Sequence, residues 1–239
     1  MNVTEAINHR RSVRKYDPNK PIDTAIVKAC LEKARLAPSS SNLQLYEFYH
    51  VVSETLQKKI SAACFDQPAA KTALQVVVFV TRKDLWRKRS KANLHFVQQH
   101  FKKPVSDHTK REKLMLAYYS KIVPITYFDF FGIIGLLKYA IFWMIGLFRP
   151  IYRQARHSDM RIVAHKSAGL AAQTFMLAMA EAGYDTCPME GHDSLRIKKI
   201  LNLPFWAEIN MVVSCGIRLP EGVYGERFRV PLKEVYFEK

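Results

Sequence analysis

Apolar residues recur along the 239-residue chain with the two spacings that distinguish helices from strands. The spacing predicts helices over residues 2–7, 24–36, 54–64, 158–183 and 194–201, and strands over 46–52, 75–81 and 209–216. The residues expected to cap the first three helices are Asn2 or Thr4, Asp23 and Ser53. The apolar face of the second helix is expected at Ile26, Cys30, Leu31 and Ala34. Gly183 is a natural end for the fourth helix, whose many small residues allow close packing.

Helices outnumber strands in this prediction, and no internal repeat, low-complexity segment or linker interrupts the sequence. We therefore expect a single α+β domain over residues 1–239, with a basic and hydrophobic insertion at about 83–156. The hydrophobic fraction of 49% and the charged fraction of 24% are close to globular averages, which excludes a disordered or fibrous chain.

Positive charge is the unusual property of the composition. Lys and Arg number 37 against 21 Asp and Glu, which gives a formal net charge of +16. Between Arg82 and Arg161 there are 17 basic and 5 acidic residues, so 12 of the 16 surplus charges lie in one third of the chain. Such a surplus predicts an anionic partner, which could be nucleic acid, a lipid surface or a phosphorylated ligand.

The four cysteines, Cys30, Cys64, Cys187 and Cys215, are far apart in the sequence and form no C-x-x-C pair. We expect reduced thiols and a cytoplasmic protein, because the N-terminus also lacks the pattern of a signal peptide. The phosphate-loop, zinc-protease and serine-hydrolase motifs are absent, and the histidines lack ligand spacing. Neither a metal site nor a nucleophilic side chain is expected.

Two groups of basic residues have the composition of anion-binding loops. They are Arg10, Arg11 and Arg14, with Ser12, after the first helix, and Arg227 and Arg229 near the C-terminus. The last two alternate, so an extended chain would point both to one side. Guanidinium groups match phosphate oxygens in geometry. From these residues alone, solvated surface arginines and an ordinary turn at 39–42 are the simpler interpretation.

Four segments taken together resemble the nitroreductase family of FMN-dependent oxidoreductases. In chain order they are RRSVRKY at 10–16, APSSSNLQ at 37–44, PMEG at 188–191, and GIR at 216–218 with YGERFR at 224–229. Each segment is weakly specific by itself, but the four keep the family's order from residue 10 to residue 229. Only the region of about 83–156 lies outside the resemblance.

The resemblance implies a central, mixed but mostly antiparallel sheet flanked by helices, in an intertwined homodimer that holds FMN at its subunit interface. It implies hydride transfer from NADH or NADPH through the flavin to a nitroaromatic, quinone or similar organic acceptor, by a ping-pong cycle without a catalytic side chain. The residues implied at the cofactor are Arg10, Arg11, Ser12, Arg14, Pro38, Ser39, Ser40, Asn42, Gln67, Pro188, Met189, Glu190, Gly191, Arg227 and Arg229.

Each of these groups has an implied place at the flavin. The phosphate would be held by Arg10, Ser12, Arg227 and Arg229. Arg14 would lie at the pyrimidine edge of the ring, and the loop at 38–42 would line the cofactor from the other subunit. The Gln67 amide would reach the ring, and a backbone N–H at 190–191 would point at flavin N5.

Two positions depart from the family pattern and leave the acceptor open. Leu45-Tyr46 stands where the family often has Pro-Trp, and His192 stands where it often has Phe. A flavin enzyme of the same fold could instead carry out an oxygen-dependent or dehalogenation reaction. A nucleic-acid-binding protein is the competing class that the charge suggests, but no such signature is recognisable and we expect no nucleic-acid partner.

The most apolar segment is residues 130–148, whose 19 residues carry one charge, Lys138. A helix of that length would be about 28 Å long, but the central lysine and an uncharged run of about ten residues argue against a membrane span. A lid or interface helix within the dimer is one interpretation. Clustered cations favour another, a monotopic element at 127–150 that lies peripherally on the inner face of the membrane. These cations are Lys102, Lys103, Lys110, Arg111, Lys113, Arg149, Arg153 and Arg156. An apolar cover would suit a hydrophobic acceptor such as a quinone.

Overall fold

The computed structural model describes residues 1–101 and 107–239. In chain order the helices are α1 (Val3–His9), α2 (Thr24–Ala34), α3 (Glu54–Ala63), α4 (Pro68–Lys71), α5 (Trp86–Phe101), α6 (Lys110–Ala117), α7 (Val123–Tyr127), α8 (Ile133–Ile145), α9 (His157–Glu181) and α10 (Ser194–Ile200). The strands are β1 (Tyr46–Val51), β2 (Gln75–Thr81), β3 (Asp185–Met189) and β4 (Glu208–Gly216). The expected α+β class is confirmed.

One four-stranded sheet forms the centre of the fold, with the strand order β1-β2-β4-β3. Every neighbouring pair is antiparallel, and one parallel bridge between Ser12 and Thr186 adds to the edge at β3. The Gly216 end of β4 lies beside the beginnings of β2 and β3, and the Glu208 end lies beside the end of β2. These two ends of the sheet carry different parts of the candidate site.

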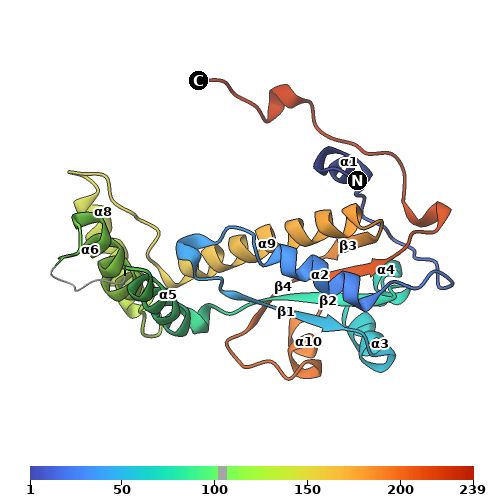
Figure 1. The fold of residues 1–239 in the computed structure, drawn as a ribbon, viewed down its shortest axis with the longest axis horizontal. Helices are drawn as coiled ribbons and strands as arrows, with labels where there is room; N and C mark the ends of the chain where they lie inside the picture. The colour runs from blue at the N-terminus through green and yellow to red at the C-terminus, as the bar shows by residue number, and fades with distance from the viewer. Residues whose placement is uncertain (102–106) are drawn as a thin grey trace.

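The central strand β2 is buried along its whole length, and its side chains alternate between two cores. Phe79 packs toward Phe175 in the core formed with α2 and α9, whereas Val78 shares a core with Ile60 of α3 and Ile197 of α10. Figure 1 shows the corresponding layers, with α2 and α9 on one face of the sheet and α3 and α10 on the other. Burial on both faces explains why this strand is a continuous apolar run in the sequence.

The long helix α9 confirms the helix expected over 158–183 within a residue or two at each end. Asp159 fixes its beginning, because its carboxylate accepts hydrogen bonds from the backbone N–H and the guanidinium of Arg156. Gly183 follows its end with φ of +81°, as a helix stop requires. The buried alanines of α9, including Ala168, Ala171 and Ala172, let α9 lie close to the sheet and to α2.

Three local features differ from the sequence prediction. β3 was not expected, because Pro188 lies within it, but an edge strand tolerates a proline that donates no ladder hydrogen bond. The short helix α4 was also not expected. Ile26 is exposed, and Val27 takes its place on the buried face of α2. The four cysteines are buried and unpaired, as expected.

The helices between Lys83 and Arg156 lie together at the beginning of α9, away from the sheet (Figure 1). Within the described residues, none of the helices has both the length and the hydropathy needed to cross a bilayer. Lys102 and Lys103, two of the cations expected beside the apolar segment, lie outside the described residues.

Candidate functional site

Two segments that are more than 200 residues apart form one basic cavity of about 270 Å³ at the Gly216 end of the sheet. Its lining comprises Arg10, Arg11, Ser12, Arg14, Val223, Tyr224, Glu226, Arg227, Phe228 and Arg229. We call its five arginines the arginine cradle. The structure therefore brings together the two groups of arginines that the sequence places at opposite ends of the chain.

Backbone contacts hold the two segments against each other. The Arg14 N–H donates to the Gly222 carbonyl at 2.6 Å, and the Arg227 guanidinium donates to the carbonyls of Asn8 and Arg10. Gly222 is required for this approach, since a Cβ there would lie 2.4 Å from the Lys15 carbonyl oxygen. This close contact fixes the backbone positions from which the cradle side chains extend.

An ion pair between Arg218 and the buried Asp185, which sequence analysis did not predict, supports the cradle. Arg218 donates from Nε to Asp185 at 2.8 Å and also to the His9 carbonyl, which joins β4, β3 and the end of α1. Asp185 is buried, and its other oxygen accepts the Arg218 backbone N–H. Arg218 therefore acts as a positioning residue for Arg10 and its neighbours.

The cradle has a surplus of positive charge. Burial lowers the pKa of Arg10, and the nearby Arg227 and Arg229 lower it further. Across 1–101 and 107–239, none of the five cradle arginines forms an ion pair with a carboxylate. A dianion with several oxygens would relieve this repulsion, and a phosphate group has that charge and shape.

The loop after β3 is held by the side chain of Gln67. Its amide donates to the carbonyls of Gly191 at 3.0 Å and Cys64 at 3.1 Å. Met189 has its side chain in the core, whereas Glu190 and Gly191 are exposed, so only the end of the predicted PMEG segment is open to a ligand. Gln67 thus lies beside the loop and fixes the orientation of the loop backbone, while its expected contact with the flavin ring stays a prediction.

The segment at 38–42 is a strained turn at the other end of the molecule. Ser41 and Asn42 both have positive φ, of 54° and 50°, which is uncommon for residues other than glycine. The Ser40 N–H donates to the Ser167 hydroxyl of α9. The Asn42 side-chain amide donates to Asn93 Oδ1 of α5, and the Asn93 amide donates back to the Asn42 backbone carbonyl. Strain that tertiary contacts maintain in this way is often found at functional sites.

The two predicted parts of the cofactor site are separated within one chain. Ser12 pairs with Thr186, which follows the end of α9, whereas Ser40 contacts Ser167, 14 residues before the last residue of α9. At 1.5 Å per residue that helical segment is about 21 Å long. The cradle and the 38–42 turn therefore lie near opposite ends of this helical segment within one chain.

A largely apolar cavity of about 260 Å³ lies against this turn. Its lining comprises Ser40, Ser41, Tyr118, Ile122, Val123, Thr126, Tyr127, Tyr152, Met160 and Val163. The Tyr127 hydroxyl is buried and forms no hydrogen bond of ordinary geometry within the described residues, and burial raises its pKa to about 12 against a smaller, opposing interaction with the Ser40 side chain. By contrast, the Tyr118 hydroxyl pairs with Ser41 Oγ at 2.6 Å. The cavity arises from tertiary packing, so no sequence signal identified it.

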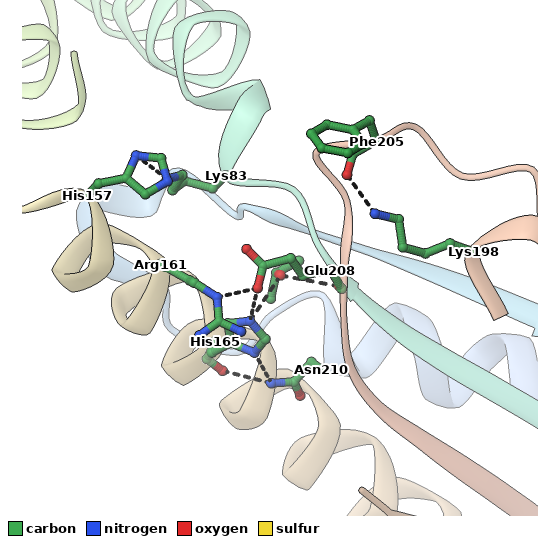
Figure 2. Close-up of polar contacts among 9 residues, drawn as sticks. Lys83, His157, Arg161, His165, Lys198, Phe205, Glu208 and Asn210 are labelled. Atoms are coloured by element: carbon green, nitrogen blue, oxygen red, sulfur yellow. Dashed lines mark hydrogen bonds and ion pairs between the residues drawn. The ribbon is translucent and has the colours of Figure 1, made fainter. Parts of the chain in front are cut away.

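A second polar cluster lies at the Glu208 end of the sheet and connects α9 to β4 (Figure 2). Glu208 accepts hydrogen bonds from Arg161 and from His165, and Asn210 donates to His165. Nearby, Lys83 contacts the imidazole of His157, and burial lowers the pKa of Lys83. These contacts hold the first half of α9, and with it Ser167, in place beneath the 38–42 turn.

Comparison with known proteins gives consistent results. Residues 7–217 match the sequence profile of the nitroreductase family. MhqN of Bacillus subtilis, named as an NAD(P)H nitroreductase, is 24% identical over 231 residues, which are 97% of this chain and 96% of that protein. Protein DrgA of Synechocystis is 23% identical and covers 97% and 91% of the two chains.

Solved structures share the fold. The crystal structure of ydfN from Bacillus subtilis, named as a nitroreductase, superposes with a TM-score of 0.74 at 22% identity, covering 99% of this chain and 98% of that one. A protein from Exiguobacterium sibiricum, named as a nitroreductase and solved in complex with FMN, gives a TM-score of 0.70 at 21% identity, with coverage of 100% and 98%.

Proposed function

The chain belongs to the nitroreductase family, and from that premise we propose that it is an FMN-dependent oxidoreductase. It takes hydride from NADH or NADPH and passes reducing equivalents to a nitroaromatic, quinone or similar organic acceptor by a ping-pong cycle. The observation that carries the proposal is the arginine cradle at the same end of the sheet as Thr186 of β3. Its five cations have no carboxylate partners among the described residues, and Arg10, Arg11 and Arg14 are half-buried.

The residues present fit the chemical groups of FMN. The cradle matches a phosphate in charge and in number of donors, with Ser12 adding a hydroxyl. The loop at 190–191 is held by Gln67, and the missing side chain of Gly191 would leave room for the close approach of a flat ring. When bound there, FMN would supply the two-electron chemistry, and the protein would bind it, orient it and keep water away.

We propose a homodimer as the active form. The distance between the cradle and the 38–42 turn supports it, because one flavin can contact both only across a subunit interface. A complementation experiment tests this directly. Arg10→Ala and Asn42→Ala variants, each poor in flavin binding, should regain up to a quarter of the sites after mixing and refolding, since half of the random dimers are mixed and each has one intact site.

The acceptor would bind in the apolar cavity against the 38–42 turn. Its walls suit a planar apolar molecule, and the free Tyr127 hydroxyl would donate a hydrogen bond to a carbonyl or nitro oxygen. Such acceptors are lipid-soluble, so the proposal includes work at the inner face of a membrane, with residues 127–150 in peripheral contact with it.

Steady-state kinetics with FMN-loaded protein test the function. NAD(P)H oxidation without oxygen should require an added quinone or nitroaromatic, and double-reciprocal plots at several acceptor concentrations should be parallel. Oxidation that requires oxygen and ignores these acceptors would favour the oxygen-dependent alternative instead.

A further inference from the structure

The helix α8 exposes a row of apolar side chains on the face that is directed away from the rest of the protein. Its inward positions include Gly135, which is buried, and Lys138, whereas its outward positions are uncharged. A surface helix normally directs apolar residues inward and polar residues outward. We call these outward positions, together with the turn that follows the helix, the outer face of α8. Its most prominent members, each more than half exposed, are Leu136, Leu137, Trp143 and Met144 on the helix and Leu147 and Phe148 in the turn.

The single charge of the apolar segment is turned away from this face. The Lys138 ammonium donates to the backbone carbonyls of Thr126 and Phe128, at and just after the end of α7. It thereby satisfies carbonyls that a helix end leaves open. The lysine that argues against a membrane span therefore contacts backbone carbonyls within the protein, and the outer face carries no charge.

Polar contacts on the inward side fix the orientation of α8. Asp129 accepts hydrogen bonds from the backbone N–H groups of Gly132 and Gly135 and from His157 of α9. Gly135 lies so close to α9 that a Cβ would come within 3.0 Å of the His157 nitrogen. Arg156 stacks over the Tyr139 ring at 4.8 Å. The helix cannot rotate to bury its outer face without breaking these contacts.

The charges near the outer face are mostly positive. Of the five basic residues from Lys121 to Arg156, Lys138 and Arg156 belong to the inward contacts, which leaves Lys121, Arg149 and Arg153, and the one acidic residue, Asp129, is paired with His157. Arg149 directly follows the outer face and is exposed. An uncharged apolar surface bordered by cations is complementary to a bilayer with anionic headgroups.

We propose that the outer face of α8 is a docking surface for an anionic lipid bilayer, with α8 lying in the plane of the membrane. The inference that α8 docks on lipid is drawn from the contacts and charges described above. The inference that docking collects a lipid-soluble acceptor rests on the proposed function, because that acceptor would bind in the cavity formed partly by η4 (Tyr118–Ile122) and α7. The cavity is lined in part by residues 118–127, which precede α8 in the chain, and by Tyr152, which follows it.

Vesicle co-sedimentation tests the docking surface. The full-length protein is mixed with phosphatidylcholine vesicles, with or without phosphatidylserine, at low and high salt. We expect binding to the anionic vesicles that salt weakens, and Arg149→Gln should reduce the preference for them. Leu136→Glu and Leu147→Glu should each lower the partition coefficient about tenfold or more. The matched control Leu195→Glu, an exposed leucine on α10, should stay within about twofold of wild type.

Three results would overturn the proposal. The first is a monodisperse wild-type protein that stays in the supernatant with both kinds of vesicle. The second is binding that the α8 variants retain. The third is an assembly larger than a dimer in analytical ultracentrifugation that Leu136→Glu dissociates while vesicle binding stays unchanged. That result would make the outer face an interface between copies of the chain. Flavin content and NAD(P)H oxidation are measured in the same samples without vesicles. A protein without bound flavin or NAD(P)H oxidation would contradict the proposed reductase function but would not change the conclusion about vesicle binding.

Discussion

Replacing Tyr127 by phenylalanine should make the protein more stable and a poorer enzyme. The Tyr127 hydroxyl is buried at the edge of the apolar cavity and lacks a hydrogen-bond partner among the described residues. A buried, unpaired polar group costs about 1–3 kcal/mol. Tyr127→Phe removes that cost and keeps the ring, whose 8% exposure shows that it packs in the core.

The expected gain is about 1 kcal/mol in the free energy of unfolding, at the low end of that range, because the interaction with the Ser40 side chain offsets part of the cost. For a chain of this size that corresponds to a rise in Tm of about 2–4 °C. The loss of one hydrogen bond to the acceptor should lower kcat/KM for a quinone by about 3- to 10-fold, with NAD(P)H oxidation by the first half-reaction unchanged.

Urea denaturation and steady-state kinetics on the same preparations measure both effects. Tyr118→Phe is the matched control, since its hydroxyl has a partner in Ser41 and is partly exposed, and it should lose about 0.5 kcal/mol. A Tyr127→Phe variant that is destabilised by more than about 1 kcal/mol would show that the hydroxyl has a partner and refute the reasoning.

Two other contacts lead to separate predictions. Asp185→Asn leaves the Arg218 guanidinium without its buried carboxylate, so the free energy of unfolding measured in urea should fall by about 2–3 kcal/mol and FMN binding should weaken. Unchanged stability would show that the pair does not support the cradle. The hydrogen bonds from Arg156 hold the pKa of Asp159 below its ordinary value of 3.8, so this pair contributes stability above that pH and loses it as the pH falls through the native pKa. The difference in urea midpoint between wild type and Asp159→Asn should therefore be larger at pH 7 than at pH 3, and an equal difference at both would contradict the ionised pair.

The elements that could be predicted from sequence are those whose signals are local. The strand β2 is a run of β-branched residues, and α9 has a recognisable stop at Gly183, so both were found with nearly correct ends. β3 was missed because Pro188 disfavours a strand unless that strand is known to lie at an edge, and edge position depends on the order of the whole sheet.

The candidate site divides in the same way. The cradle arginines were expected because short motifs resemble a family, and the structure brings them together. Arg218 lies in one of those motifs, but its ion pair with Asp185 was not expected, and Asn93 had no motif at all, because both contacts depend on segments that only the fold brings together. The inward turn of Lys138 could not be predicted either, because a sequence pattern counts a charge without showing where it points.

The visible absorption spectrum during anaerobic titration with NADH or NADPH tests whether the protein is an FMN-dependent reductase. We expect flavin absorption bands in the protein, or in the protein reconstituted with FMN, that bleach on addition of one of the two nucleotides and return on addition of a quinone. A protein that takes up no FMN would contradict the claim, as would a bound flavin that neither nucleotide reduces.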